Sequence, residues 1–247
     1  MSTTNENPSF LPKQLHILSG SSLKVLACII MFIDHYASCL LRYSPAANTF
    51  LYSFMGKNYS LYSFCRNVGR LAFPIFCFLL VEGFYHTSNR IRYGRNLLLF
   101  ALLSEIPWNF ASGRTLHYDK QNVYFTLLLG FLAMCLVELF QGFALMQAIA
   151  LFGCLFLAIP LQADYSYRGY ILIMIIYFLR QKRAAQALIA SAWLKYEWTA
   201  GFAFLPINMY NGKRGFVKAP ALKYFFYLFY PVHLAILAAL RWNIYHI

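Results

Sequence analysis

Apolar runs separated by short polar and basic stretches fill almost the whole chain. A hydrocarbon core of ~30 Å requires roughly 20 apolar residues in a helix. Measured against that length, the pattern predicts an all-α polytopic membrane protein with about nine transmembrane helices, several of them short. The expected helices span residues 22–42, 61–87, 95–110, 122–140, 143–160, 169–180, 184–199, 200–211 and 220–243.

The seventh and eighth of these helices are the least regular. Lys195, Glu197 and Gly201 interrupt the apolar run there, so two half-helices that reach only part of the way across fit the pattern as well as two crossings. We expect residues 1–21 to form a short cytoplasmic segment and residues 22–247 to form a single transmembrane domain.

The composition supports a membrane protein and argues against a nucleic-acid partner. Of 247 residues, 60% are hydrophobic and 12% are charged, and the mean hydropathy is +0.53, which is outside the usual range of soluble domains. The net charge of +13 comes from 21 Lys and Arg residues that lie mainly between apolar runs, where topology explains them. The six cysteines form no CxxC pair and have no histidine at metal-binding spacing, so we expect no metal.

Three basic clusters define the orientation, because short cytoplasmic loops carry an excess of Lys and Arg. With nine crossings they follow the second, sixth and eighth helices and therefore lie on one side of the membrane. The N-terminus is then cytoplasmic and the C-terminus is outside. The clusters are Arg90, Arg92 and Arg95; Arg180, Lys182 and Arg183; and Lys213, Arg214 and Lys218.

Ionisable side chains inside membrane helices are costly, so they usually face the protein interior and indicate a functional site. At 1.5 Å per residue, His35 lies ~16 Å deeper than Lys24, about half a bilayer. The second helix runs in the opposite direction, with Arg66 and Arg70 on one face of its outer half. By the same measure, five ionisable residues reach one level near the middle of the membrane: Asp34, His35, Arg70, Glu105 and His233.

Two interpretations of these residues stay open. In the first they only form ion pairs that specify helix packing, Asp34 with Arg70 and Glu82 with an arginine of residues 90–95. In the second, His35 is a general base, because a neutral imidazole can accept a proton near physiological pH. For His233 a packing role and a reactive role fit equally well.

The arginines of residues 90–95 also have two interpretations. They anchor a cytoplasmic loop, or they bind phosphate groups of a nucleotide-bearing donor through bidentate contacts. We group Lys24, Glu82 and His86 with Arg90, Arg92 and Arg95 as candidate donor-binding residues, since all lie toward the cytoplasmic side.

Several segments resemble the TraX family over most of the chain, from about residue 23 to residue 240. The resemblance is carried by IDH (33–35), RLAFPIF (70–76), VEGFYHTSNR (81–90), SEIP (104–107) and YFFYLFYPVHL (224–234). That family is named for a membrane protein implicated in N-terminal acetylation of conjugative pilin. The resemblance therefore implies acetyl transfer at the inner membrane of a bacterium.

A more distant similarity links the chain to membrane acyltransferases of the acyltransferase-3 type. Those enzymes carry a basic residue, ten residues and a histidine on the first helix, followed by an RxxR motif on the cytoplasmic side. Lys24 and His35 match the first feature, and Arg92 with Arg95 matches the second. This chain is smaller and has no attached domain, which leaves transfer to an extracellular glycan open.

Together these similarities imply a transmembrane acyltransferase-like bundle that uses acetyl-CoA from the cytoplasm. We expect His35 to deprotonate an acceptor amine or hydroxyl on a protein, glycan or lipid, with Asp34 or Glu105 holding the imidazole and Arg70 fixing the carboxylate. Two alternatives are a proton-coupled transporter or flippase and a non-catalytic assembly factor for pili or the cell envelope. Binding of acetyl-CoA is expected of the enzyme alone.

Overall fold

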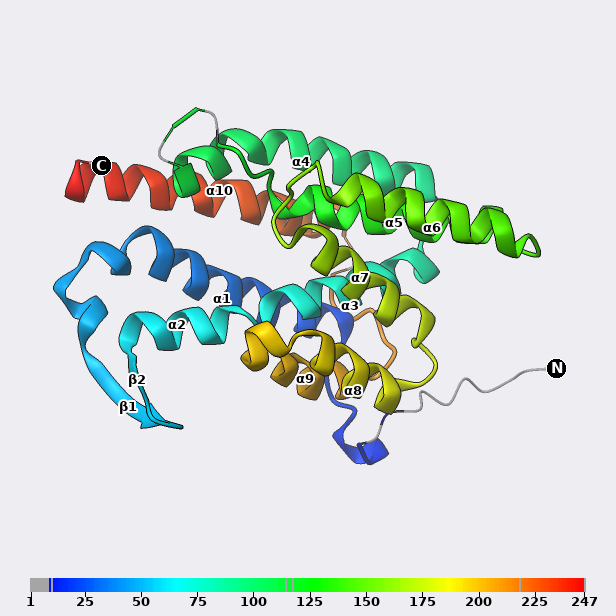
Figure 1. The fold of residues 1–247 in the computed structure, drawn as a ribbon, viewed down its shortest axis with the longest axis horizontal. Helices are drawn as coiled ribbons and strands as arrows, with labels where there is room; N and C mark the ends of the chain where they lie inside the picture. Colours follow the sequence, from blue (N-terminus) through cyan, green and yellow to red (C-terminus); the bar gives the residue numbers. More distant parts are fainter. Residues whose placement is uncertain (1–8, 10, 114, 117, 218, 247) are drawn as a thin grey trace.

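A computed structural model describes residues 9, 11–113, 115–116, 118–217 and 219–246. Helices dominate these residues and run roughly along the long axis of the molecule (Figure 1). The helices are α1 (Gly20–Cys39), α2 (Leu61–Gly69), α3 (Ala72–His86), α4 (Arg90–Gly113), α5 (Val123–Leu139), α6 (Ala144–Ala158), α7 (Ser166–Phe178), α8 (Arg183–Trp193), α9 (Phe204–Asn208) and α10 (Pro220–Tyr245). The 3-10 helices are η1 (Lys13–Leu15), η2 (Leu41–Tyr43), η3 (Pro45–Asn48) and η4 (Lys195–Ala203).

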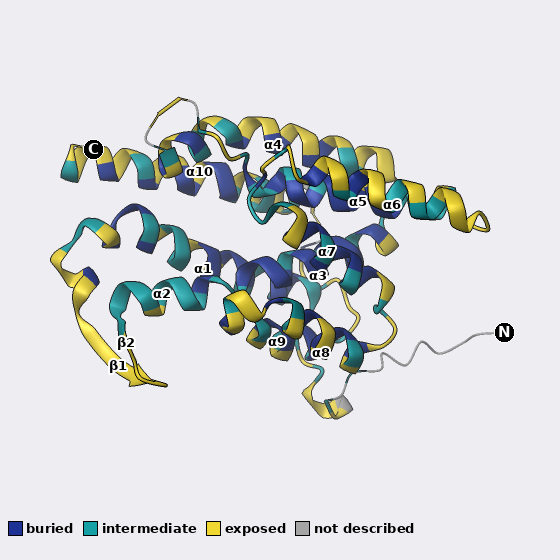
Figure 2. Cartoon of the chain, in the orientation of Figure 1, coloured by how far each residue is buried: buried dark blue, intermediate teal, exposed yellow. Residues whose placement is uncertain are grey.

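Three helical stretches are long and apolar enough to cross a membrane: Gly20–Tyr43, Leu61–His86 and Ala221–Tyr245. Three shorter apolar helices, α5, α6 and α7, accompany them. Large apolar side chains also remain exposed along α4, α6 and α10, as Figure 2 shows in yellow. Because water would disfavour so much exposed apolar surface, these features identify a membrane protein.

Two pairs of long helices form the sides of the molecule. α1 packs against α2 and α3, and α4 packs against α10; Figure 1 shows the α4–α10 pair above the α1–α2 pair. The ends of the helices follow ordinary capping rules: the Ser19 hydroxyl accepts the Ser22 N–H at 3.1 Å at the start of α1. The Asn122 side chain accepts the Tyr124 N–H at 3.0 Å at the start of α5.

The helix boundaries correct the sequence analysis at two places. α4 begins at Arg90, so the arginine cluster belongs to its first turns and not to the loop before residue 95. The expected spans 184–199 and 200–211 appear as α8, η4 and α9, and η4 contains a kink at Glu197 with φ −129° and ψ 60°. This region therefore contains short helical pieces around an irregular turn, as the interrupted apolar run allowed.

A β-hairpin was missed by the prediction of an all-α chain. β1 (Phe50–Phe54) pairs with β2 (Lys57–Ser60) in antiparallel orientation. Met55 and Gly56 connect them with φ of 48° and 73°, the backbone that tight two-residue hairpin turns require. The hairpin is exposed (Figure 2) and follows the end of α1.

Connections between the shorter helices meet close to the polar residues of the interior. The Asp164 N–H donates to the Gln121 carbonyl at 2.8 Å, which joins the segment before α7 to the segment before α5. Thr126 of α5 donates its hydroxyl to the Asp164 carbonyl. Backbone that is not helical is thus hydrogen-bonded within the protein, as the low dielectric of a bilayer requires.

Candidate functional site

A pair of hydrogen-bonded histidines links α1 to α10. His35 Nδ1 and His233 Nε2 are 2.6 Å apart, and the rings lie nearly parallel at 14° with centroids 4.9 Å apart. His233 Nδ1 lies 2.6 Å from the Phe229 carbonyl oxygen, one helical turn earlier in α10. The helical rise of 1.5 Å per residue therefore predicted correctly that these two residues lie at the same level.

These contacts assign the tautomers of both rings. A carbonyl can only accept, so His233 Nδ1 donates, and in a neutral ring His233 Nε2 must then accept. His35 Nδ1 consequently donates to His233, which leaves the lone pair of His35 on Nε2. In the described chain no hydrogen bond is made by that nitrogen. A base whose second nitrogen is fixed by an orienting group is the arrangement found in catalytic triads.

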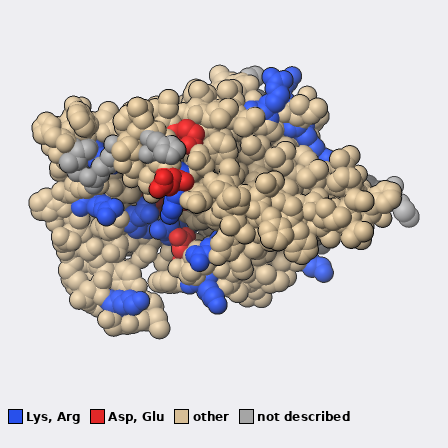
Figure 3. All heavy atoms as spheres, turned by 45° about the horizontal axis from the view of Figure 1, so that its top comes forward, with Lys and Arg blue, Asp and Glu red and all other residues tan. Residues whose placement is uncertain are grey.

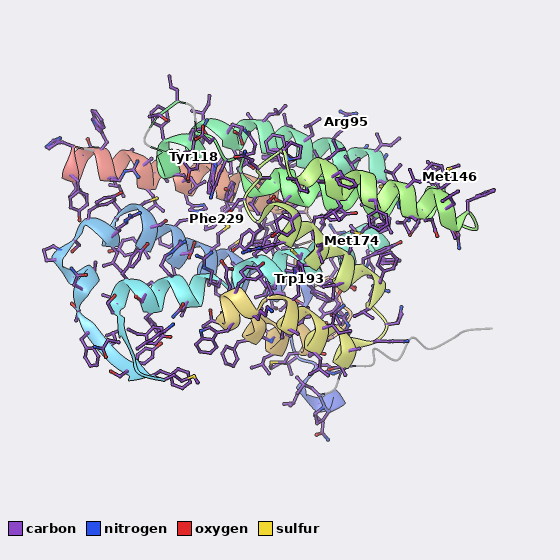
Figure 4. The ribbon with its side chains drawn as sticks, in the orientation of Figure 1. Arg95, Tyr118, Met146, Met174, Trp193 and Phe229 are labelled. Atoms are coloured by element: carbon purple, nitrogen blue, oxygen red, sulfur yellow. The ribbon has the colours of Figure 1, made fainter. Side chains whose placement is uncertain are left out.

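Aromatic rings enclose the histidine pair. The Phe229 ring stacks on His233 at 4.8 Å between centroids, Phe32 packs edge-on to it at 6.1 Å, and Tyr230 packs edge-on to His35 at 5.8 Å. His233 is 4% exposed, and Figure 4 shows Phe229 between α10 and α1. These rings surround the histidine pair with apolar surface.

A proline shapes α10 just before His233. Pro231 has no N–H, so the Tyr227 carbonyl loses its usual helical donor. The hydroxyl of Tyr124 in α5 donates to this carbonyl at 3.1 Å. The missing hydrogen bond is thus replaced from a neighbouring helix, which fixes α5 against α10 beside the histidines.

The predicted ion pair between Asp34 and Arg70 is wrong, because each residue has another partner. Arg66 Nη1 lies 2.6 Å from Asp34 Oδ2, and Arg70 Nη1 lies 2.7 Å from Glu197 Oε1 in η4. Gly69 permits this close approach of α2 to α1, since a Cβ at that position would overlap the Asp34 side chain. Asp34 still lies close enough to Arg70 for the two opposite charges to attract each other.

The expectation that Asp34 or Glu105 holds the His35 imidazole is also wrong, since His233 occupies that role. Glu105 Oε1 accepts the backbone N–H of Asn122 at 3.1 Å and a hydrogen bond from its side-chain amide. Asn122 is fully buried and also donates to the Ala101 carbonyl at 2.8 Å. Glu105 therefore ties the start of α5 to α4.

Glu82 lies in a buried ionic network with an arginine from the connection between α7 and α8 and another at the start of α8. Arg180 donates to both carboxylate oxygens at 2.8 and 3.2 Å, and Arg183 Nη2 lies 3.5 Å from Oε1. The predicted pairing with residues 90–95 is therefore wrong. His86 shares the face of Glu82 as expected, with its Nδ1 2.8 Å from the Glu82 carbonyl oxygen.

The arginines of the predicted donor site separate around the start of α4. Arg90 forms an ion pair with Glu138 of α5 at 2.5 Å and stacks on Phe84 at 4.2 Å. Arg92 lies close enough to Lys223 for the two positive charges to repel each other. Arg95 is exposed, and Figure 4 shows it on the side of α4 turned away from α1.

Four cations gather where α1, α4, α10 and the segment before α10 meet. We call Lys24, Arg92, Arg214 and Lys223 the cationic cluster. Lys24 Nζ packs over the Phe226 ring at 5.3 Å, and Ser21 donates its hydroxyl to the Arg214 carbonyl at 2.7 Å. None of the described carboxylates forms an ion pair with these four residues.

Several members of these groups were not predicted from the sequence. Arg214 was interpreted only as part of a basic cytoplasmic cluster, although it precedes the last apolar run. Lys223, at the start of that run, was not singled out. Glu197 was recognised only as an interruption. A basic residue in the first turn of the last helix, which also carries His233, was the available signal for Lys223.

Comparisons with known proteins support the resemblance. A sequence profile described as "TraX protein" matches residues 19–241. A protein of Dichelobacter nodosus described as "Probable fimbrial assembly protein FimC, serogroup H1" is 28% identical over 252 aligned positions, which cover 90% of this chain and 96% of that protein. No solved structure matches the chain.

Proposed function

We propose that this chain, which belongs to the TraX family, is a membrane-bound acyltransferase that uses acetyl-CoA from the cytoplasm. The observation that carries the proposal is the hydrogen-bonded pair of His35 and His233 inside the bundle. A partly buried base with an oriented second nitrogen has no evident need in a purely structural bundle. The acceptor is an amine or hydroxyl, on a pilin N-terminus, a surface glycan or a lipid.

In the proposed topology the chain crosses the inner membrane of a bacterium about nine times, with its N-terminus in the cytoplasm. The start of α1, the start of α4 and the start of α10 then lie on the cytoplasmic side, together with the cationic cluster. Arg180 and Arg183 lie on the same side, in agreement with the excess of cytoplasmic Lys and Arg in known membrane proteins.

The cationic cluster supports a phosphate site for the donor. Four cations that no described carboxylate neutralises repel one another, and an anionic ligand would relieve that repulsion. Lys24 and Arg92 were expected here from the sequence, while Arg214 and Lys223 are added by their proximity. Arg90 is paired with Glu138, so we assign it a lesser part, and Arg95 remains a candidate at the rim.

In the proposed reaction the acetyl group passes directly to the acceptor. His35 Nε2 removes the proton of the acceptor amine or hydroxyl as its nitrogen or oxygen bonds to the thioester carbon. The carbon–sulfur bond then breaks, and the imidazolium returns its proton to the coenzyme A thiolate. His233 orients His35 and shares its positive charge. In a two-step path the acetyl group is transferred first to His35 and then to the acceptor, and the products are the same.

A second candidate function is a non-catalytic role in assembly of fimbriae. The description of the Dichelobacter nodosus relative as a fimbrial assembly protein favours it. An assembly factor would need no donor site, so binding of acetyl-CoA at the cationic cluster would discriminate between the two functions.

Donor binding by the purified full-length protein tests the proposal. We expect acetyl-CoA to bind saturably, and the double variant Arg92→Ala with Lys223→Ala to bind at least about tenfold more weakly, since two charge-assisted contacts are lost. Arg42→Ala is the matched control, because Arg42 is exposed and follows the opposite end of α1. Absence of acetyl-CoA binding by the wild-type protein would reject the enzyme and leave the assembly role.

A further inference from the structure

A cavity of about 400 Å³ lies beside the connection between α6 and α7, separate from the histidine pair. Four parts of the chain surround it: the α6–α7 connection with the first turn of α7, η4, the junction between α2 and α3, and the connection between α4 and α5. Its charged lining residues are Arg70, Lys120, Asp164, Arg168 and Glu197. Figure 3 shows a hollow on one face of the molecule in which acidic and basic side chains lie next to each other.

The backbone around this cavity is strained. Gln162, Tyr165 and Ser166 have φ of 47°, 65° and 42° and all line the cavity. Only two other non-glycine residues in the described chain have positive φ, Met55 in the hairpin turn and His246 at the end of α10. Left-handed conformations of such residues are costly, and they cluster where a loop is held in shape for a ligand.

One polar atom in the cavity wall lacks a partner. Glu197 uses Oε1 for the ion pair with Arg70 at 2.7 Å, but its Oε2 is buried without a hydrogen bond to any described residue. Asp164 accepts the Tyr165 N–H through Oδ1 at 3.2 Å. A buried carboxylate oxygen without a donor is destabilising, and a ligand that donates a hydrogen bond would satisfy it.

The charge of the lining residues indicates which hydrogen-bonding group a ligand would carry. Three cations against two carboxylates give the lining a net positive charge, which disfavours an ammonium group. A hydroxyl can instead donate to Glu197 and accept from Arg168 or Lys120. Tyr167 and Tyr196 are both 39% exposed at the rim, and Arg168 packs over Tyr196 at 4.4 Å and covers that face of its ring. Aromatic rings of this kind stack against the C–H face of a sugar.

We propose that this cavity binds a neutral sugar of the acceptor, with its hydroxyls on Glu197, Asp164 and Arg168 and its ring against Tyr167 or Tyr196. This inference rests on the proposed acyl transfer and names the class of acceptor. The cavity wall lies one helical turn from the base, because Arg70 follows Arg66, which forms the ion pair with Asp34 at 2.6 Å, and Asp34 directly precedes His35.

Sugar binding without the donor tests the inference separately from acyl transfer. The full-length protein is purified in lauryldimethylamine oxide, because maltoside detergents carry a sugar headgroup that would compete. Calorimetric titration uses glucose, galactose, N-acetylglucosamine and the disaccharides lactose and chitobiose, and a tripeptide with a free amino terminus serves as the competing class of ligand.

We expect at least one sugar to bind saturably, and Tyr167→Ala and Glu197→Gln each to weaken it about tenfold or more. Tyr52→Ala is the matched control, since Tyr52 is also 39% exposed but lies on the hairpin. Tyr167→Ala removes an exposed side chain whose hydroxyl accepts a hydrogen bond from Arg168 at 3.3 Å, so it remains informative if Glu197→Gln disturbs folding through Arg70.

Failure of every sugar to bind, while acetyl-CoA still binds, would overturn this inference and leave the acyltransferase in place. Binding of the tripeptide that Glu197→Gln abolishes would overturn it in favour of an amine acceptor. Sugar binding that Tyr167→Ala and Glu197→Gln leave unchanged would also overturn it, because the sugar would then bind elsewhere.

Discussion

Removal of the Glu82 charge separates a structural role of this residue from a role in donor binding. Glu82 is 5% exposed and accepts hydrogen bonds from Arg180, and the side chain of Arg183 is only 3% exposed at 3.5 Å. In Glu82→Gln the side chain keeps its size, but two guanidinium groups remain in a buried site without a counter-charge.

The expected cost is large. Breaking a buried ion pair by removing one partner costs about 3–5 kcal/mol, because the remaining charge stays desolvated. Arg180 can move toward water, since its side chain is 18% exposed, whereas Arg183 packs over the Phe78 ring at 4.4 Å. We therefore expect the lower half of that range, carried mainly by Arg183.

Unfolding of Glu82→Gln and wild type in the same detergent measures this cost. His86→Ala is the control, because the His86 side chain is 60% exposed and its loss should change the free energy of unfolding by about 0.5 kcal/mol or less. Adding Arg183→Leu to Glu82→Gln should recover part of the lost stability, as apolar replacement of a buried pair often does. A Glu82→Gln protein that is as stable as wild type but fails to bind acetyl-CoA would refute this reasoning and assign Glu82 to the donor site.

Two further changes test the packing and the cavity. Gly69→Ala places a methyl group against Asp34 and should lower the free energy of unfolding by about 1–3 kcal/mol; an unchanged thermal midpoint would contradict the close contact of α1 with α2. Burial raises the pKa of the Asp164 carboxyl to about 6, with Asp34 and Glu197 also raising it and Arg70 lowering it. Asp164 therefore ionises between roughly pH 5 and 7, and sugar binding should strengthen over that range, because an ionised carboxylate is the better acceptor. The profile should become flat in Asp164→Asn, and a flat profile in wild type would contradict the assignment.

Helical geometry along the sequence predicted the common depth of the two histidines, but not their contact. The rise per residue placed His35 and His233 at one depth, and they form a hydrogen bond. Helix length and apolar runs likewise predicted the positions of α1, α5, α6 and α10 to within a few residues.

The ion-pair partners of the charged residues were less predictable, because they depend on where the helices are interrupted. The Arg70 N–H donates to the Arg66 carbonyl at 3.2 Å, so the two arginines lie one helical turn apart, as the sequence implied. Arg70 meets Glu197, which lies in an irregular turn whose position no hydrophobic period encodes. The neighbouring Arg66 takes Asp34 instead.

The hairpin was missed because its residues are as apolar as those of the helices around them. Phe50, Leu51, Tyr52 and Phe54 favour strands as much as they favour a membrane interface. The positive φ at Met55 and Gly56 shows that the Met-Gly step was the relevant turn signal.

Turnover of acetyl-CoA by His35→Ala tests the central claim most directly. Wild type, His35→Ala and His233→Ala are compared for binding of acetyl-CoA and for its slow hydrolysis or transfer. We predict that all three bind the donor, that His35→Ala loses turnover, and that His233→Ala keeps a reduced turnover with a shifted pH profile, because His35 then lacks its orienting partner. Full turnover by His35→Ala, with donor binding intact, would contradict the proposed role of His35 as the base.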